Sequence, residues 1–278
     1  MNKLSIDRQS QIIKVLCGGN SIRSTSRITG AAVNTVVKLL REVGLVCLDY
    51  QNEVMHNLPC KKLQCDEIWS FVYSKAKNVP DEYNGKFGYG DVWTFTAIDA
   101  DTKLVPSWLV GQRNIDCATD FINDLKGRLA NRVQITTDGH NMYLEAVENV
   151  YGSEIDYAQL VKIYKQDPEP ERRYSPAKCT GAEKQVIQGK PDVKDISTSY
   201  VERQNLTMRM SMRRFTRLTN AFSKKFGNHM MALSLYFMHY NFARPHKSLA
   251  KPYPMTPAMA AGITNKIWEI EDIIRLMD

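Results

Sequence analysis

The stretch from residue 63 to residue 164 constrains the fold of this chain most, because strand-type and helix-type patterns alternate along it. Three strand-type segments come first, followed by an amphipathic helix, a short buried-type strand, a second helix and a further strand. This order is typical of a mixed sheet with helices packed on it, so we predict an α/β fold. The expected strands are 63–72, 91–99, 103–111, 132–138 and 155–164, and the expected helices are 117–130 and a segment after Gly139 that includes 143–152.

The residues before this stretch have helical spacing throughout. A helix over 7–17 stops at two glycines, and the segment 20–44 forms two short helices separated by a turn at Gly30. A short helix, a glycine-containing turn and a second helix are the helix-turn-helix pattern. In this interpretation the second helix, about 31–42, enters the major groove. The polar side chains free to reach bases or phosphates are Asn34, Thr35, Lys38 and Arg41. The alternative is a small three-helix bundle that only caps another domain.

The remaining segments complete the predicted domain organisation. Residues 165–199 are rich in Pro, Lys, Asp and Ser, which indicates a long surface loop. Helices are expected over 200–222, over 228–243 and within 265–277. We therefore predict a helix-turn-helix domain at 1–46, a linker at 47–62, a catalytic-type sheet domain at 63–250 and a helical tail at 251–278.

Composition excludes several classes of protein. Hydrophobic residues make up 43% of the 278 residues and charged residues 24%, as in soluble globular proteins. No apolar run approaches the ~20 residues that a membrane helix needs, and the N-terminus lacks the apolar stretch of a signal peptide, so we expect a cytoplasmic protein. The six cysteines are scattered without a C-x-x-C pair, so we predict reduced thiols and no zinc site.

Positive charge is concentrated in one region. Residues 200–251 contain ten lysines and arginines against one acid, Glu202, while the whole chain carries +7 and the other 226 residues therefore carry −2. Such a basic region binds phosphate backbones largely without regard to sequence. On a helical wheel Glu202 lies at the edge of the face that should be buried. The residues three and four positions after it, Asn205 and Leu206, are not basic. An ion pair within the helix is therefore excluded for Glu202.

Two further acids lie in strands, where aspartate is depleted because its carboxylate is costly to desolvate. Asp66 lies inside the first strand, and Asp138 ends the strand before Gly139. Two acids on central strands and a glutamate at the head of a helix packed on the sheet would converge on a hard cation. Three carboxylates can hold two Mg²⁺ ions ~3.5–4 Å apart, which is the arrangement used for in-line phosphoryl transfer.

The order of these acids resembles the DDE triad of ribonuclease-H-like transposases and retroviral-type integrases. Several blocks are similar to the IS-one family of bacterial insertion-sequence transposases and together span about residues 60–275: "LQCDEIWSFVYSK", "GDVWTFTAIDADTKLVPSWLVG", "LANRVQITTDGHNMYLEAV", "TSYVERQNLTMRMSMRRFTRLTNAFSKK" and "YNFARPHKSL" with "TPAMAAGI". The resemblance implies a ribonuclease-H-like mixed sheet flanked by helices, preceded by the small all-α domain. The metal ligands of the family correspond to Asp66 in "CDEIW", Asp138 in "TTDGH" and Glu202 in "YVERQN".

The resemblance also implies an activity. A DNA transposase of this kind cleaves phosphodiester bonds at the ends of the element and joins the freed 3′-hydroxyl to target DNA, with Mg²⁺ or Mn²⁺ as cofactor. Many members carry cysteine pairs that form a zinc finger ahead of the helix-turn-helix, whereas Cys17 and Cys47 stand alone here. We therefore expect the helix-turn-helix to recognise the ends. Pairing of two ends implies at least a homodimer on DNA, associated with the bacterial nucleoid and not with a membrane.

The remaining basic residues receive supporting roles in this interpretation. The helical arginines should position the phosphodiester backbone rather than contact bases: they are Arg203, Arg209, Arg213, Arg214 and Arg217. His140 either contacts the scissile phosphate or has a structural role. Arg244 and His246 either contact phosphates or belong to a solvated turn.

Two other functions are compatible with the same sequence. A DNA-binding repressor would use the sheet domain only to dimerise, and would bind its operator without a divalent metal. A metal-dependent nuclease would cut DNA without joining the strands.

Overall fold

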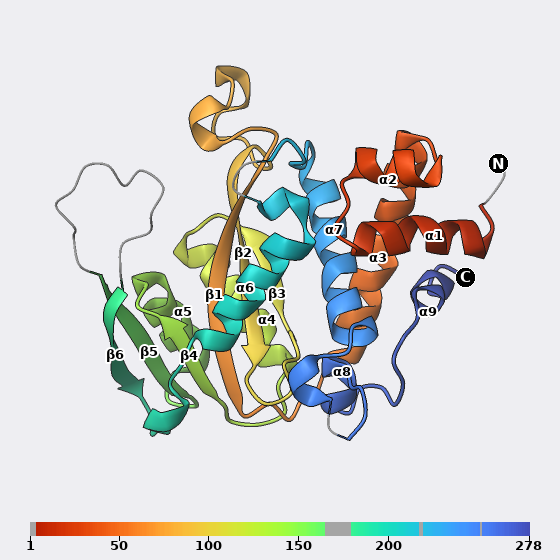
Figure 1. Ribbon diagram of the computed structural model, residues 1–278. Helices are drawn as coiled ribbons and strands as arrows, with labels where there is room; N and C mark the ends of the chain where they lie inside the picture. The colour runs from red at the N-terminus through yellow and green to blue at the C-terminus, as the bar shows by residue number, and fades with distance from the viewer. Residues whose placement is uncertain (1–3, 165–178, 217–218, 251) are drawn as a thin grey trace.

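A six-stranded mixed sheet forms the centre of the molecule (Figure 1). The computed structural model describes residues 4–164, 179–216, 219–250 and 252–278. The strand order is β3-β2-β1-β4-β5-β6, in which β1, β4 and β5 are parallel to one another and the remaining neighbours are antiparallel. The strands are β1 (Lys62–Val72), β2 (Gly90–Asp99), β3 (Trp108–Gly111), β4 (Gln134–Asp138), β5 (Asp156–Tyr164) and β6 (Cys179–Gln188).

Helices cover both faces of the sheet. On one face Phe95 of β2 contacts Phe121 and Tyr143, which lie on two helices that pack against each other. On the other face Trp108 of β3 stacks on Phe237 of a later helix. The helices are α1 (Ile6–Cys17), α2 (Ile22–Thr29), α3 (Val33–Val54), α4 (Ile115–Arg128), α5 (Asn141–Tyr151), α6 (Ser199–Ser211), α7 (Phe226–Met238), α8 (Pro257–Ala260) and α9 (Ile270–Arg275).

The three N-terminal helices pack on one another as the sequence predicts. Gly30 ends α2 with φ of 69°, a left-handed conformation that glycine adopts without the strain of a Cβ atom. The second helix of the pair, α3, is longer than the predicted 31–42 and continues through the first part of the predicted linker to Val54. Residues 47–54 are helical because Cys47 and Gln51 are buried against α7, where the Gln51 side chain donates to the Ser234 carbonyl.

Helix α3 and helix α7 approach each other closely at Gly44. A Cβ atom added to Gly44 would lie 2.5 Å from the Met231 carbonyl oxygen, so only glycine permits this crossing. The C-terminal half of α3 is thereby part of the layer that covers the sheet, and Figure 1 shows the two helices side by side.

Three predicted elements differ in extent. The strand predicted over 103–111 begins only at Trp108, because the backbone of Val105 pairs with the side chain of Asn241 and Pro106 cannot donate to a ladder. The predicted helix over 200–222 ends at Ser211, where the extended conformation of Met212 turns Met212 and Phe215 into the core. The helix predicted over 228–243 changes to a π-helical turn after Met238.

Of the loop predicted over 165–199, residues 165–178 lie outside the described residues, and the remainder contains a strand. Residues 179–188 form β6, whose side chains are mostly exposed and lack an alternation of apolar and polar residues. The strand forms because its backbone pairs with that of β5. The last predicted helix is shorter than expected, since α9 covers only six residues.

The predicted fold class is confirmed. The sheet has the antiparallel β1–β2–β3 meander followed by parallel β4 and β5, helices lie on both faces, and a small all-α segment precedes it. Among the described residues no helix has the length and apolar character required to span a bilayer.

Candidate metal site and its basic surroundings

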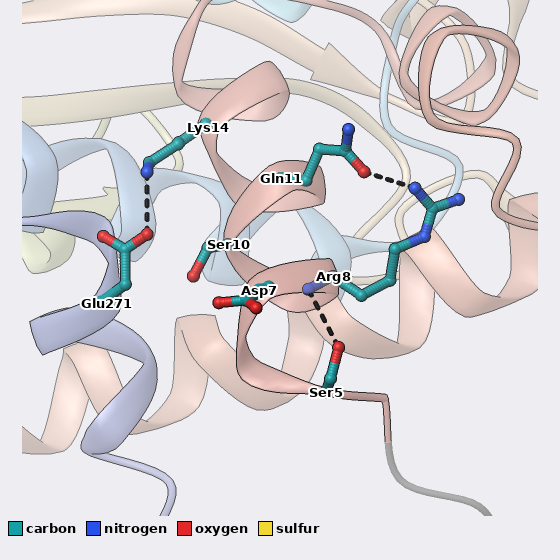
Figure 2. Close-up of a pocket in the computed structure, with 7 residues that line it drawn as sticks. All are labelled: Ser5, Asp7, Arg8, Ser10, Gln11, Lys14 and Glu271. Atoms are coloured by element: carbon teal, nitrogen blue, oxygen red, sulfur yellow. Dashed lines mark hydrogen bonds and ion pairs between the residues drawn. The ribbon is translucent and has the colours of Figure 1, made fainter.

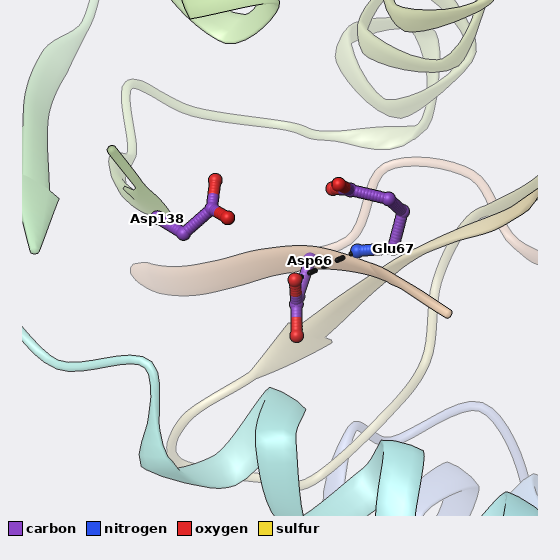
Figure 3. Close-up of side chains that lie close together, drawn as sticks. All are labelled: Asp66, Glu67 and Asp138. Atoms are coloured by element: carbon purple, nitrogen blue, oxygen red, sulfur yellow. Dashed lines mark hydrogen bonds between the residues drawn. The ribbon is translucent and has the colours of Figure 1, made fainter. Parts of the chain in front are cut away.

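Strand pairing places Asp66 beside Asp138. In the parallel register of β1 and β4, Cys65 lies opposite Thr137, and the two aspartates follow directly where this pairing ends. Carboxylate oxygens of Asp66, Glu67 and Asp138 lie within 4.8 Å of one another (Figure 3). The two acids that the sequence singled out as unusual in strands therefore come together at the carboxyl end of β4.

The N-terminus of α6 is fixed to β1 by a side chain from the strand. Thr198, the residue before α6, makes no capping hydrogen bond with its side chain to the helix backbone. Instead, the Gln64 side-chain oxygen accepts from the backbone N–H groups of Tyr200 at 2.8 Å and Val201 at 3.2 Å. Gln64 is buried and lies two residues before Asp66, on the same face of the strand. This contact sets the position of α6 relative to the strand aspartate.

A second contact joins the same helix to Asp66 directly. The Asn205 side-chain amide donates to Asp66 Oδ2 at 2.8 Å, while Asp66 Oδ1 accepts from the backbone N–H of Glu67 at 2.9 Å. Asn205 is buried, and its Oδ1 has no hydrogen-bond partner in the described structure. Since Asn205 follows Glu202 by three residues, the face of α6 that carries Glu202 faces β1.

Glu202 itself has other partners. Its Oε1 lies 2.6 Å from Lys162 Nζ of β5 and accepts a short hydrogen bond from the Thr198 hydroxyl. The close group of acids found among the described residues includes Asp66 and Asp138 but not Glu202. Glu202 is nevertheless near enough for its charge to act on Asp66. The third acid of the predicted triad therefore lies at the border of the group, neutralised by a lysine.

Glu67 is an acid of this group that the sequence reasoning did not select. Its side chain is 2% exposed and is held by Arg113, with Nη2 at 2.5 Å and Nε at 2.7 Å from Oε1. The Tyr143 hydroxyl donates to Oε2 at 3.1 Å. Strand alternation places Glu67 on the sheet face opposite to Asp66, against α5. Its adjacency to Asp66 in "CDEIW" is visible in the sequence, but its partner Arg113 is 46 residues away.

The electrostatics of Asp66 differ from those of an ordinary surface carboxylate. Burial, followed by the nearby charges of Glu67, Asp138 and Glu202, raises the pKa of Asp66 to about 7. Burial and the charge of Asp138 also raise the pKa of Glu67, although Arg113 opposes this. A cation beside Asp66 and Asp138 would relieve the repulsion that raises the pKa of Asp66.

The donor set fits a hard divalent cation. All candidate ligands are carboxylate oxygens, which Mg²⁺ and Mn²⁺ accept and which bind softer metals less well. No cysteine belongs to the group, and among the described residues no cluster of His and Cys accompanies it. Asp66 and Asp138 are the two ligands that the geometry brings together, while Glu67 is already engaged by Arg113.

The predicted phosphate-binding arginines are divided by the structure. Arg203 and Arg213 are exposed and Arg209 is half-buried. Arg214 donates to the Ser223 hydroxyl at 2.7 Å and to the Asn228 carbonyl at 3.3 Å, and burial lowers the pKa of its guanidinium to about 10. Arg214 therefore supports the chain between α6 and α7. Arg217 lies outside the described residues.

His140 has a structural role in this structure. The His140 ring Nδ1 accepts from the backbone N–H of Met142 at 3.3 Å and thereby caps α5. The backbone N–H of His140 donates to Asp138 Oδ1 at 3.2 Å. It is one of the two roles that the sequence leaves open for this histidine.

Arg244 and His246 lie in an exposed turn near Arg203. Burial, together with the positive charges of Lys103, Arg244 and Arg203, lowers the pKa of His246. Its Nδ1 is 2.9 Å from the Ser248 hydroxyl oxygen. Arg203 of α6 and Arg244 of the turn thus contribute to one group of positive charge.

The polar residues predicted to reach DNA lie on the exposed side of α3. Asn34, Lys38 and Arg41 are exposed and Thr35 is half-buried, while Val36 and Leu40 face the core. Lys38 Nζ lies 3.6 Å from Glu42 on the next turn.

A polar pocket between α1 and α9 lies away from the carboxylates (Figure 2). Three of its charged residues already have partners, since Lys14 Nζ is 2.8 Å from Glu271 Oε1 and the Arg8 guanidinium donates to Gln11. It lies where the N-terminal and C-terminal helices meet.

No protein-family model matches the sequence, and no curated protein matches it. Several solved structures are similar at low identity. One belongs to the simian T-cell lymphotropic virus intasome in complex with PP2A regulatory subunit B56 gamma: 12% identity, 87% of this chain and 70% of that chain, TM-score 0.41. Another is the piggyBac transposase synaptic complex with hairpin DNA: 11% identity, 99% of this chain and 71% of that chain, TM-score 0.43. The Mos1 transposase paired-end complex with the left transposon end shares 10% identity over 56% of this chain and 60% of that chain, with a TM-score of 0.23.

Proposed function

We propose that this chain is a DDE-type DNA transposase of the IS-one kind, in which Asp66, Asp138 and Glu202 are the catalytic acids. The observation that carries the proposal is the meeting of Asp66 and Asp138 at the end of β4, with α6 fixed over Asp66 through Gln64 and Asn205. Burial, together with the charges of Glu67, Asp138 and Glu202, raises the pKa of Asp66, and a cation held between the acids would offset this accumulation of negative charge.

The three acids would hold Mg²⁺ or Mn²⁺. Bound there, such ions would supply activation of the attacking oxygen and stabilisation of the leaving oxygen in an in-line displacement at phosphorus. Asp66 and Asp138 are in place for this, whereas Glu202 must exchange Lys162 for the metal by turning its side chain. Asn205 keeps Asp66 Oδ2 oriented, and Glu67 stays with Arg113.

The remaining residues bind the nucleic acid. Arg203, Arg209 and Arg244 contact the phosphodiester backbone near the acids, Arg213 contacts it beyond the end of α6, and all four hold it without regard to sequence. The exposed polar face of α3 contacts the ends of the element. Water and then the freed 3′-hydroxyl are the nucleophiles, so no side chain has to form a covalent bond to DNA. Two protomers are needed to hold two ends together.

Single substitutions at the acids test this function. Asp66→Asn, Asp138→Asn and Glu202→Gln should each reduce Mg²⁺-dependent cleavage and strand transfer at least 10³-fold. Binding to an element-end fragment should stay within about threefold of the wild type. The assay combines purified protein, a labelled end fragment and a plasmid target, with EDTA as the metal-free control. A matched variant is Glu67→Gln, which should lose stability because Arg113 loses its partner, while retaining activity.

The same assay separates the alternatives. A nuclease gives cut but never joined products, and a repressor gives neither while it binds DNA in EDTA. Near-normal strand transfer by any one of the three acid variants would show that the site is assigned incorrectly.

A further inference from the structure

The connection between β1 and β2 projects from the body of the protein as an arm, which we define as residues 73–89. In Figure 1 the arm is the gold segment that rises above the sheet at the top of the view. Tyr73, Tyr83 and Tyr89 pack on one another within it, and the rings of Tyr83 and Tyr89 stack at 4.5 Å. These contacts and two short 3₁₀ turns give the arm its own ordered structure.

The arm is fixed to the chain that joins α6 to α7. The backbone N–H of Tyr73 donates to the Ser223 carbonyl at 2.8 Å, and Val72 forms a parallel bridge with Ser223. The rings of Phe87 and Phe226 lie 4.5 Å apart. Ser223 is itself held by Arg214. The arm and this connection therefore form one surface, although 130 or more residues separate them in the sequence.

Six cations lie on this surface, and we call them the arm cluster: Lys75, Lys77, Lys86, Arg213, Lys224 and Lys225. All are exposed except Lys75, which is half-buried. None of the six forms an ion pair with a carboxylate within the part of the chain that the structure describes. Lys75 and Lys86 instead lie over the rings of Trp69 and Tyr83, at 5.7 Å and 5.6 Å from the ring centroids.

Three acids near the arm offset about half of this charge and leave a net charge of +3. Asp81 and Glu82 belong to the arm, and Asp91 follows it. Asp91 Oδ1 accepts from the backbone N–H of Ala76, so it stabilises the base of the arm. Many other lysines and arginines of the protein are paired with acids, including Lys14, Lys62, Lys126, Arg132 and Lys194. Unpaired cations gathered on one projecting surface are the electrostatic pattern of a site for a polyanion.

The arm cluster lies at a defined distance from the acids. Val72, the residue before the arm, lies six positions after Asp66 on β1, which corresponds to about 20 Å along the strand. Asp66 lies near the middle of β1, and the arm follows the last residue of the strand. Duplex DNA carries one charge per about 1.7 Å of its axis, so a duplex that follows the strand from the acids to the arm presents about twelve phosphates over that distance.

We propose that the arm cluster binds the backbone of target DNA, an inference that rests on the proposed transposase function for the identity of that DNA. Five of the six cations are lysines, whose ammonium groups act as point charges without the bidentate geometry used to recognise bases. The cluster offers no groove-entering helix or strand. The arm cluster is therefore suited to DNA that is bound regardless of sequence. The exposed polar face of α3 is suited to the element ends.

The test compares two triple variants that remove the same charge. The arm variant is Lys75→Gln/Lys77→Gln/Lys86→Gln, and the control variant is Lys61→Gln/Lys184→Gln/Lys190→Gln, whose lysines are also exposed but lie at the start of β1 and around β6. Affinity for a 40-bp duplex of unrelated sequence is measured by fluorescence anisotropy between about 50 and 300 mM salt. Cleavage and strand transfer are measured in parallel, and thermal melts confirm that both variants fold.

In the arm variant the slope of log affinity against log salt should fall by about one for each lysine removed. Affinity at 100 mM salt should fall at least tenfold, and strand transfer into plasmid should fall with it while cleavage of the end fragment stays near the wild-type rate. The control variant should change far less. Unchanged salt dependence in the arm variant, or an equal loss in the control, overturns the proposed surface.

Two results separate this inference from the catalytic assignment. A loss of duplex affinity confined to the arm variant supports the surface even if the wild-type protein cuts no DNA, in which case the transposase function fails alone. If cleavage of the end fragment falls as far as strand transfer, the arm holds the element end, and the assignment to target DNA is wrong.

Discussion

Asn205 of α6 donates a hydrogen bond to Oδ2 of Asp66, so a side chain one turn after Glu202 touches the strand aspartate directly. The contact joins two elements that are 139 residues apart. Together with Gln64, which accepts from the first backbone N–H groups of α6, it fixes the helix on β1 at two points. The position of Glu202 relative to Asp66 is thus determined by two amide side chains that are buried in the same interface.

Replacing Asn205 by leucine should weaken the metal site. The substitution removes the hydrogen bond that orients the Asp66 carboxylate, and loss of such a supporting contact typically costs about 10- to 100-fold in metal affinity. The Mg²⁺ concentration for half-maximal strand transfer should rise accordingly.

Gln204→Leu is the matched control for Asn205→Leu. Gln204 is the preceding residue, equally buried, and its amide donates to the Tyr236 hydroxyl instead of a carboxylate. This variant should lose stability without a change in the Mg²⁺ requirement. Equal Mg²⁺ requirements in the two variants would mean that Asn205 serves only packing.

Replacing Lys162 by methionine should tighten Mg²⁺ binding. The ammonium of Lys162 pairs with Glu202 at 2.6 Å and competes with any cation for that carboxylate. Because both side chains are partly exposed, the pair contributes about 1 kcal/mol or less, which corresponds to at most about a fivefold gain in affinity.

Isothermal titration with Mg²⁺ in the absence of DNA measures this effect, with Lys184→Met of neighbouring β6 as the control. Weaker Mg²⁺ binding by the Lys162 variant would show that the lysine supports the site instead of competing with the metal.

Acidification should destabilise the protein through His229. This buried side chain lies between the hydroxyls of Ser70 and Ser223, and burial, with the charge of Arg214, lowers its pKa to about 3. The unfolded chain takes up the proton near pH 6.5. Stability is therefore complete above pH 6.5 and is lost as the pH falls toward 3, by about 2 kcal/mol at pH 5.

Urea denaturation at pH 7 and pH 5 checks this value, with His229→Gln as the variant that cannot titrate. The difference in pH dependence between the two proteins isolates His229 from other buried groups such as His239, whose pKa is also lowered by burial. An identical pH dependence in both proteins would contradict the assignment.

Gly44→Ala should destabilise the fold by about 1–3 kcal/mol, because the new methyl group would overlap the Met231 backbone where α3 crosses α7. Gly227→Ala, in the first turn of α7, is the control. No atom lies within 4 Å of a Cβ added there, so this change should be neutral or slightly stabilising. Thermal or chemical denaturation compares the two variants. Tolerance of alanine at position 44 would show that the helices can separate there.

Much of the fold could be predicted from the sequence because its strands and helices have clear periodicity. The buried strands β1, β2, β4 and β5 were located closely, since alternation and β-branched residues mark them. Strand β6 was missed because its side chains are exposed and its stability comes from backbone pairing with β5. The end of α6 at Ser211 was missed because a helical wheel cannot show that Met212 turns into the core.

The site was predictable in part. Asp66 and Asp138 were conspicuous because acids are rare in strands, and the register of β1 and β4 brings them together. The partner of Glu202 could not be predicted, because Lys162 lies 40 residues away on another strand. The roles of Glu67, Gln64 and Asn205 depend on which sheet face each side chain occupies, and that is fixed only by the tertiary packing of α5 and α6.

Because α3 is one continuous helix, it connects the N-terminal helices rigidly to the sheet that carries the acids. The first turns of α3 follow α2 in the N-terminal helical segment, and its last turns pack against α7. The two ends of one helix therefore belong to different parts of the molecule. If α3 binds the element ends as proposed, the distance and direction from the bound duplex to Asp66 and Asp138 are set by the fold.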